Sequence, residues 1–406
     1  MPVLLIGTLD TKGDEIGFVR DRLQEAGLST IILDVGSLNP PKIVPDRTRE
    51  SVFLAAKTTL AAITRAGDRG LAVTKAAEGA TVIAQQIHAA GELQGIIALG
   101  GSAGTTIGTA AMRALPFGIP KVMVSTLASG QVANFVGVRD ILMLNSVVDI
   151  AGLNRISKLV LGNAAAALAG MVRELDATRS RAEADPKPLI TATMFGVTTA
   201  CVEVSRPVLE AKGFEVLVFH ATGTGGRTME SLIRDGLIAG VLDVTTTELA
   251  DELVGGTLTA GRDRMTAAAL RGVPQVISVG ALDMVNFGPR ASVPSKFDAR
   301  RFYQHNDNIT LMRTTPEEND QLGKEIAEKA SAASGPTAIV LPLRGVSAID
   351  AEGKPFWWPE ADAALFQSIR NWVSPDVELI ERDLHINDAE FATELANVLL
   401  RLMRKK

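Results

Sequence analysis

A mixture of polar residues follows directly on the first apolar run of the chain. The segment Gly7 to Glu15, GTLDTKGDE, comes after Val3 to Ile6 and contains two glycines, two threonines, a lysine and three acids. Glycine lets backbone amides turn toward a ligand, and the N-terminus of a following helix favours anions. We therefore expect an anion site with Mg²⁺ near Asp10, whereas Asp14 and Glu15 cap the helix. Its residues are Gly7, Thr8, Asp10, Thr11 and Lys12.

A second loop of this kind occurs in residues 96 to 112, IIALGGSAGTTIGTAAM. An apolar strand ends in two glycines, and small and hydroxyl residues precede a helix, which suits a phosphate held by backbone amides. The loop lacks the lysine of a Walker A motif and the GxGxxG spacing. The alternative is a tight turn between strand and helix. The candidate binding residues are Gly100, Gly101, Ser102, Gly104 and Thr105.

The second half of the chain offers a further anion site in VFHATGTGGRTME, residues 218 to 230. Its glycines and arginine can bind a substrate anion, and these residues are Gly223, Gly225, Gly226 and Arg227. His220 is the candidate acid or base, with a hydrogen-bonded structural histidine as the alternative. Glu248 is a candidate base or a helix cap. Arg313 and Arg344, after later apolar runs, are candidate substrate contacts.

Several chemistries are disfavoured by composition. There is one cysteine, Cys201, and four histidines without HxxxH spacing, so zinc is disfavoured, and no GxSxG motif marks a serine hydrolase. Forty-one basic against 46 acidic residues disfavour general nucleic-acid binding. The N-terminus lacks the features of a signal peptide, so we expect a cytoplasmic protein.

The apolar segment Leu159 to Val172 spans fourteen residues, fewer than the roughly 18 to 20 that cross a bilayer. We therefore expect no membrane association and interpret it as a core helix. Its alanines also permit close helix packing in a core or a subunit interface.

Short Val-, Ile- and Leu-rich runs alternate with amphipathic helical segments, which predicts an α/β fold with mainly parallel sheets flanked by helices. Residues 176 to 188 are charged and contain two prolines, as linkers do. We expect an N-terminal nucleotide-binding lobe over residues 1–180, a linker over 181–188 and a C-terminal α/β lobe over 189–406. The expected strands are 3–6, 30–34, 95–99, 121–125, 142–145, 189–194, 215–220 and 240–242.

Five segments together resemble the UPF0261 family, also described as the Tm-1-like ATP-binding family. They are GTLDTKGDE at residue 7, IIALGGSAGTT at 96, VVDIAGLN at 147, HATGTGG at 220 and GKPFWWPEADAALF at 353. The resemblance implies two Rossmann-like lobes, ATP binding with Mg²⁺, and homodimers. Plant and fungal members carry a fused TIM-barrel domain, which we expect here as a separate partner polypeptide. Trp358 stands where the family has aspartate, which weakens any role for that position.

Together these features predict a nucleotide site at the opening segment, in which Lys12 binds a phosphate group and Asp10 lies near the metal ion. Its second wall is either the 100–106 loop or the 222–227 loop. The expected function is an ATP-dependent one on a small anionic metabolite, held between the lobes by His220, Arg227, Arg313 and Arg344. One alternative is a non-catalytic, ATP-responsive dimeric module. Another is an ATP-independent isomerase or lyase acting on a sugar acid.

Overall fold

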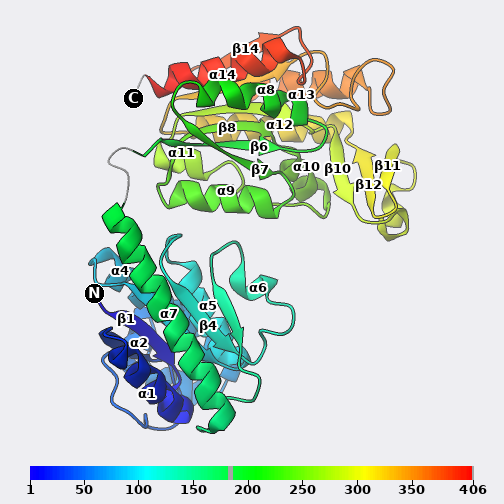
Figure 1. The fold of residues 1–406 in the computed structure, drawn as a ribbon. Coiled ribbons are helices and arrows are strands. Elements are labelled where there is room, and N and C mark those ends of the chain that lie inside the picture. The colour runs from blue at the N-terminus through cyan, green and yellow to red at the C-terminus, as the bar shows by residue number, and fades with distance from the viewer. Residues whose placement is uncertain (182–185, 405–406) are drawn as a thin grey trace. The chain divides into compact units, whose positions relative to one another are not determined.

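The computed structural model describes residues 1–181 and 186–404. The chain forms two compact units, Met1–Ala184 and Asp185–Lys406 (Figure 1). Each unit contains a parallel sheet with helices on both faces, which confirms the predicted α/β fold class. Four residues of the expected linker at 181–188, residues 182–185, lie outside the described part of the chain.

The N-terminal unit is built on a five-stranded parallel sheet, sheet A, with strand order β2-β1-β3-β4-β5. Its strands are β1 (Val3–Gly7), β2 (Thr30–Asp34), β3 (Gly95–Gly100), β4 (Lys121–Ser125) and β5 (Leu142–Asn145). All five lie where the sequence predicts them. Short aliphatic runs, which are buried on both faces in β1, β3 and β4, have few other stable arrangements.

Helices cover both faces of sheet A because side chains along a strand point alternately to either side. Val3 and Leu5 pack with helices α1 and α7, whereas Leu4 and Ile6 pack against the opposite layer of α2 to α5. The helices of this unit are α1 (Leu9–Glu25), α2 (Arg49–Ala55), α3 (Leu60–Ala66), α4 (Arg69–Ala89), α5 (Ser102–Arg113), α6 (Ala133–Val136) and α7 (Arg155–Arg181).

The opening segment differs from the loop that the sequence suggests. Helix α1 begins at Leu9, because the Thr8 carbonyl accepts hydrogen bonds from the amides of Thr11 and Lys12 and closes the first turn at once. Lys12 itself has non-helical angles, φ −125° and ψ 20°, which kink the helix there. The polar residues therefore lie on a distorted first turn of a helix rather than on an extended loop.

Helix α7 is 27 residues long, so the fourteen-residue apolar segment is only its central part. By length and composition Arg155–Thr178 is sufficient to cross a membrane, although the core helix of a soluble protein passes the same test. One face of α7, with Leu161, Ala164, Leu168 and Val172, packs into the core between the helix and sheet A. The expectation of a core helix therefore holds for that face.

The C-terminal unit contains a six-stranded parallel sheet, sheet B, with strand order β14-β13-β9-β8-β6-β7. Its strands are β6 (Leu189–Met194), β7 (Glu215–His220), β8 (Ile238–Thr245), β9 (Gln275–Gly280), β13 (Thr337–Pro342) and β14 (Glu378–Arg382). A small antiparallel sheet, sheet C, was not expected from the sequence. It consists of β10 (Met284–Phe287), β12 (Ile309–Arg313) and β11 (Phe302–Asn306).

One face of sheet B packs on α8 and α14, and the other packs on the remaining helices of the unit. These elements are α8 (Thr199–Glu210), α9 (Thr224–Arg234), α10 (Thr247–Val254), α11 (Ala267–Arg271), α12 (Pro316–Ser331), α13 (Pro359–Trp372) and α14 (Ala389–Met403), with 3₁₀ turns η1 (Arg290–Ser292) and η2 (Ser295–Phe297). Cys201 on α8 is fully buried in this core.

Candidate functional site

A pocket of about 800 Å³ opens at the carboxyl edge of sheet A, where ligands bind in open parallel sheets. Residues that follow β1, β2 and β3 line it together with residues of α3 and α4. It contains seven of the ten residues that the sequence proposes for nucleotide binding. These are Thr8, Asp10, Thr11, Lys12, Gly101, Ser102 and Gly104.

The other three predicted residues, Gly7, Gly100 and Thr105, do not line the pocket but pack next to residues around it. A β-carbon on Gly7 would lie 2.6 Å from the Ile16 side chain, and one on Gly100 would lie 2.8 Å from Gly104 Cα. Thr105 is buried, and its Oγ1 lies 2.6 Å from Ser125 Oγ. These residues therefore allow close packing of strand and helix and do not line the pocket.

Asp10 presents an unusual carboxylate. Its Oδ2 accepts hydrogen bonds from the amides of Leu38 (3.0 Å) and Asn39 (3.3 Å). Its Oδ1 is buried and has no hydrogen-bond partner among the described residues. A β-carbon on Gly36 would lie 2.9 Å from this carboxylate, so a larger residue there would displace it. Because buried polar atoms are normally paired, the orphan oxygen is suited to a donor or a cation from outside the chain.

Asp34, which sequence reasoning missed, holds the loop beside this pocket. Its Oδ1 accepts hydrogen bonds from the amides of Leu9 (3.1 Å) and Gly36 (2.9 Å). Burial raises the pKa of its carboxyl group, partly opposed by those two bonds. The feature of the sequence that could have identified Asp34 is its position as an acidic residue at the carboxyl end of the predicted strand 30–34.

The segment between β5 and α7 is fastened to α1 beside the pocket. Lys12 Nζ donates to the Ile150 carbonyl at 2.5 Å, and Glu15 Oε1 accepts from the Gly152 amide at 2.6 Å. Glu15 is fully buried, so it anchors this segment and does not cap α1 as expected. Asp149 of the same segment lines the pocket. An ammonium group with three donors retains capacity for a ligand oxygen.

The start of α5 supplies a second group of donors. Gly101 precedes the helix and has no side chain to cap it. The first amides of a helix lack partners within that helix, so those of Ser102, Ala103 and Gly104 are directed beyond its N-terminus. All three residues line the pocket.

The remaining wall is largely apolar and comes from α3, α4 and α5. Its apolar side chains include Ile63, Val73, Ala76 and Ile107, together with Val35, which follows β2; Thr64, Asp68 and Arg69 line the pocket as well. This wall was not expected, because the segment that forms α3 and α4 reads as ordinary amphipathic helix. The pocket thus combines charged side chains and helix amides with aliphatic side chains.

In the C-terminal unit, the amides of the predicted glycine loop already bind an anion of the chain itself. Glu248 Oε1 accepts from the amides of Gly223 (2.7 Å) and Gly226 (3.1 Å). Its Oε2 accepts from Arg264 Nε at 2.7 Å, and Arg264 also binds Asp243. All three charged side chains are buried. Glu248 is therefore neither an exposed base nor a helix cap.

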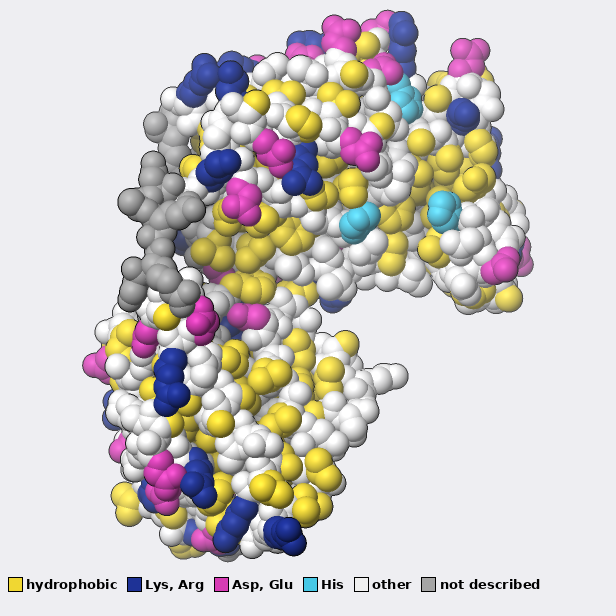
Figure 2. Space-filling view, in the orientation of Figure 1, with side chains coloured by type: hydrophobic (Ala, Val, Ile, Leu, Met, Phe, Trp, Pro, Cys, Tyr) yellow, Lys and Arg dark blue, Asp and Glu magenta, His cyan; other side chains and the backbone are white. Residues whose placement is uncertain are grey.

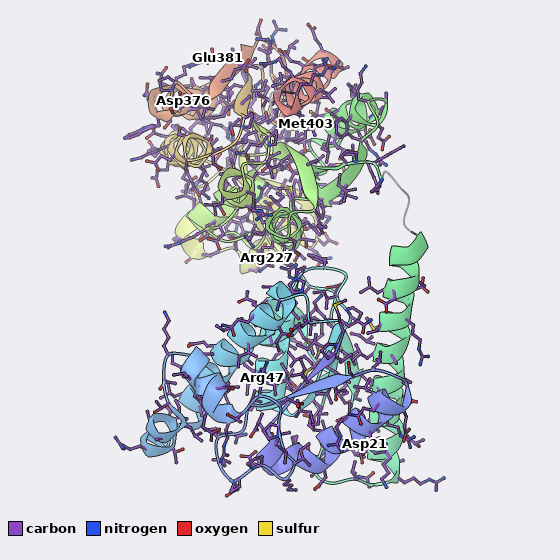
Figure 3. The ribbon with its side chains drawn as sticks, turned by 90° about the vertical axis from the view of Figure 1, so that its left-hand side faces the viewer. Asp21, Arg47, Arg227, Asp376, Glu381 and Met403 are labelled. Carbon is purple, nitrogen blue, oxygen red and sulfur yellow. The ribbon has the colours of Figure 1, made fainter. Side chains whose placement is uncertain are left out.

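The other residues of that loop also serve the fold. A β-carbon on Gly225 would collide with the His220 carbonyl, so Gly225 is a packing glycine. Arg227 Nε donates to the Gly223 carbonyl at 3.3 Å, and the residue lies at the periphery of its unit in Figure 3. The His220 side chain is exposed and makes no hydrogen bond within the described residues.

The two remaining arginines lie in separate ion pairs. Arg313 is fully buried and donates to Asp362 Oδ1 at 2.6 Å and to the Phe356 carbonyl at 2.7 Å. Arg344 is exposed and pairs with both carboxylate oxygens of Asp383, at 2.8 and 2.7 Å. The six predicted substrate contacts are thus distributed over distinct intramolecular networks.

Comparison with known proteins gives a consistent family assignment. Residues 1–177 match the N-terminal domain of the uncharacterised protein family UPF0261, and residues 187–403 match its C-terminal domain. A UPF0261 protein of Clostridium tetani is 50% identical over 99% of both chains. UPF0261 protein RA0729 of Rhizobium meliloti is 47% identical over 96% of both.

The comparison also includes a plant protein and a solved structure. The ToMV resistance protein Tm-1(GCR237) of Solanum lycopersicum is 42% identical over 99% of this chain, which covers 56% of the tomato protein. A putative UDP-N-acetylglucosamine 2-epimerase of Listeria monocytogenes aligns with a TM-score of 0.24 and 10% identity, over 100% of this chain and 96% of that one.

Proposed function

The chain belongs to the UPF0261 family, and from that premise we propose that its N-terminal unit binds ATP with Mg²⁺ in the pocket at the carboxyl edge of sheet A. The observation that carries this proposal is the composition of that pocket. Lys12 and the first residues of α5 line it together with aliphatic side chains. Phosphate oxygens suit the ammonium group and the helix amides, and a purine ring suits the aliphatic side chains.

The residues present also fit a magnesium ion. Mg²⁺ is usually held by one or two carboxylates together with phosphate oxygens and water. Asp10 offers one buried oxygen without a partner, and the described residues contain no cluster of three or more metal-binding side chains. Asp10 would hold the ion, which supplies positive charge beside the phosphates. Lys12 would bind a phosphate oxygen while it remains bonded to the Ile150 carbonyl.

Calorimetric titration with ATP and Mg²⁺ tests the proposal. We expect Lys12→Ala to weaken binding at least tenfold, or about 1.4 kcal/mol, because a charge-assisted bond is lost. Lys42→Ala is the matched control, since Lys42 lies beside α1 but pairs with Asp14 and does not line the pocket. Equal affinities of wild type and Lys12→Ala would refute this placement, as would the absence of ATP binding by the wild type.

The C-terminal unit favours a second candidate function, a nucleotide-responsive binding module without turnover. The amides of Gly223 and Gly226 bind Glu248, and Arg313 and Arg344 are paired within the chain. A substrate anion would have to displace these partners. ATP turnover that is lost in His220→Ala at unchanged ATP affinity would instead favour an ATP-dependent enzyme acting on an anionic metabolite.

A further inference from the structure

The connection between β13 and α13, residues 343–358, is fastened to sheet C by one arginine. Arg313 on β12 donates from Nε to the Phe356 carbonyl at 2.7 Å and from Nη2 to the Trp358 carbonyl at 3.5 Å. Phe356 is fully buried, whereas residues 352–355 are exposed. The connection is the orange loop at the upper right of Figure 1. The bonds of Arg313 and the burial of Phe356 thus hold its outer half in place.

Three carboxyl groups lie around this one guanidinium. Arg313 Nη2 is 2.6 Å from Asp362 Oδ1 on α13 and 3.4 Å from Asp350 Oδ1 in the connection. Asp283, which follows β9, is the third; its Oδ2 accepts from Ser347 Oγ at 2.8 Å, and its Oδ1 has no partner among the described residues. Figure 2 shows charged side chains at the surface of this loop, whereas all four of these ionisable side chains are buried. One cation cannot compensate three carboxylates in the interior, so the carboxyl cluster, Asp283, Asp350 and Asp362, must hold protons.

The pKa values indicate where these protons are held. Burial raises the pKa of Asp283 well above its usual range, and the charge of Asp350 raises it further. Burial raises the pKa of Asp362 from 3.8 to about 7, although Arg313 opposes this shift. A hydrogen bond between the Asp362 and Asp350 carboxyls, which requires a proton, raises it as well. Asp283 is thus protonated at neutral pH, and the Asp350–Asp362 pair loses its shared proton near pH 7.

The charged groups around the cluster do not supply a second cation. Arg300 is paired with Glu318 at 2.6 Å. Arg301 is exposed and donates to the Trp357 carbonyl at 3.1 Å. The His385 ring accepts an amide hydrogen bond at Nδ1, so it is in its neutral form and its Nε2 donates to a carbonyl of the connection. Within the part of the chain that the structure describes, a second carboxylate in the cluster therefore has no counter-charge.

We propose that the carboxyl cluster is a pH-sensitive switch: with its shared proton it holds the connection against β12, and loss of that proton releases the outer half of the connection, residues 351–358. Once the proton leaves, repulsion between two buried carboxylates replaces the bond between Asp350 and Asp362. Asp362 is fixed on α13 and keeps its bond to Arg313, so Asp350 and the residues after it move. Residues 351–358 can move together because the Lys354 amide bonds to a carbonyl within the same turn.

The direction of the switch follows from the sign of the pKa shift. A carboxyl whose pKa is raised in the folded state stabilises that state at low pH, and this contribution is lost as pH rises through the raised value. The connection is therefore held below about pH 7 and released above it.

Tryptophan fluorescence measures this release, because Trp357 and Trp358 lie in the connection and the third tryptophan, Trp372, can be replaced by phenylalanine. In the full chain with Trp372→Phe, we expect acrylamide quenching to rise at least twofold between pH 6 and pH 8.5, with a midpoint near pH 7. Adding Asp362→Asn removes the titrating group, while the new amide can still donate to Asp350. We expect quenching in that variant to stay low throughout.

Asp251→Asn is the matched control. Asp251 is another buried carboxyl of the same unit, and burial raises its pKa to about 7 as well. It lies outside the cluster, so Asp251→Asn in the Trp372→Phe chain should leave the quenching midpoint unchanged. The control thus separates release of the connection from a general change in the stability of the unit.

Hydrogen exchange of the wild type decides the matter without any variant. After correction for the intrinsic rates, we expect protection of the amides in residues 347–358 to fall at least tenfold from pH 6 to pH 8.5, while α12 keeps its protection. Quenching that does not change with pH, or a midpoint that persists in Asp362→Asn, would overturn the proposal. An equal loss of protection in α12 would also overturn it, because the whole unit would then be opening.

Discussion

At the scale of single residues, the C-terminal glycine loop shows how one carboxylate can occupy an anion site from within. Glu248 satisfies two loop amides and the buried Arg264 at once. Removing one partner of a buried ion pair leaves the other charge without compensation. The side chain is therefore central to the stability of the unit rather than to the binding of a ligand.

We expect Glu248→Ala to lower the free energy of unfolding by about 3–5 kcal/mol, because two buried amides lose their acceptor and Arg264 keeps only Asp243 and Glu230 as partners. Glu210→Ala removes an exposed partner of Arg206 and should change it by less than about 1 kcal/mol. Urea denaturation of both variants measures the difference. If Glu248→Ala lowered the free energy of unfolding no more than Glu210→Ala does, the buried network around Arg264 would contribute little to stability.

Asp251 gives a residue-level prediction about pH. Burial raises the pKa of this carboxyl from 3.8 to about 7, despite hydrogen bonds from Asn286. The unfolded chain therefore ionises this group first, and its contribution to stability falls as pH rises from about 4 to about 7. Asn286 Oδ1 has no partner among the described residues, so its amide can turn to accept a hydrogen bond from an asparagine at position 251.

We accordingly expect Asp251→Asn to flatten the pH dependence. The wild type loses stability between pH 5 and pH 7.5, because its buried Asp251 carboxyl has a raised pKa. The variant has no carboxyl at this position, so its free energy of unfolding relative to that of the wild type is higher at pH 7.5 than at pH 5. Urea midpoints at the two pH values provide the test. A difference between the two proteins that stays constant with pH would contradict the role assigned to Asp251.

At the scale of elements, the sequence predicts the strands of sheet A more reliably than the starts of helices. All five strands of sheet A were found because aliphatic runs of four to six residues end at glycine or a polar residue. The start of α1 was missed because glycine and threonine at the strand exit suggest a loop, whereas the Thr8 carbonyl closes a helical turn. Sheet C was missed because β11 is mostly polar and exposed.

The candidate site follows the same rule. The polar residues after β1 and β3 were recognised because lysine, aspartate and paired glycines at strand exits are unusual. Asp34 and the apolar wall were not, since helix periodicity cannot indicate that α3 and α4 border a pocket. The C-terminal loop resembles an anion site in sequence because the acid that occupies it, Glu248, lies 22 residues after Gly226.

Gly36 gives a prediction for the β2–α2 connection. A β-carbon there would displace the Asp10 carboxylate, so we expect Gly36→Ala to weaken Mg²⁺-dependent ATP binding several-fold. Gly196→Ala is the control because a β-carbon at Gly196 meets nothing within 4 Å. Titration with and without Mg²⁺ separates the metal contribution. Unchanged Mg²⁺ dependence in Gly36→Ala would remove Asp10 from the metal site.

At the scale of the whole molecule, each unit has its own hydrophobic core. Two clusters lie within residues 1–184, and four lie within residues 185–406. We expect residues 1–181 expressed alone to fold and to bind ATP with the affinity of the full chain. Circular dichroism and titration of this fragment provide the test. A folded fragment without ATP affinity would show that the C-terminal unit contributes to the site.

The burial of Cys201 has a practical consequence for spectroscopy. Burial raises the pKa of its thiol to about 12, so it stays protonated and unreactive toward maleimides at neutral pH. The native chain is therefore not expected to react with thiol-specific labels. Two engineered surface cysteines, one in each unit, can carry a fluorophore pair without background, and energy transfer between them would report how nucleotide binding changes the distance between the units.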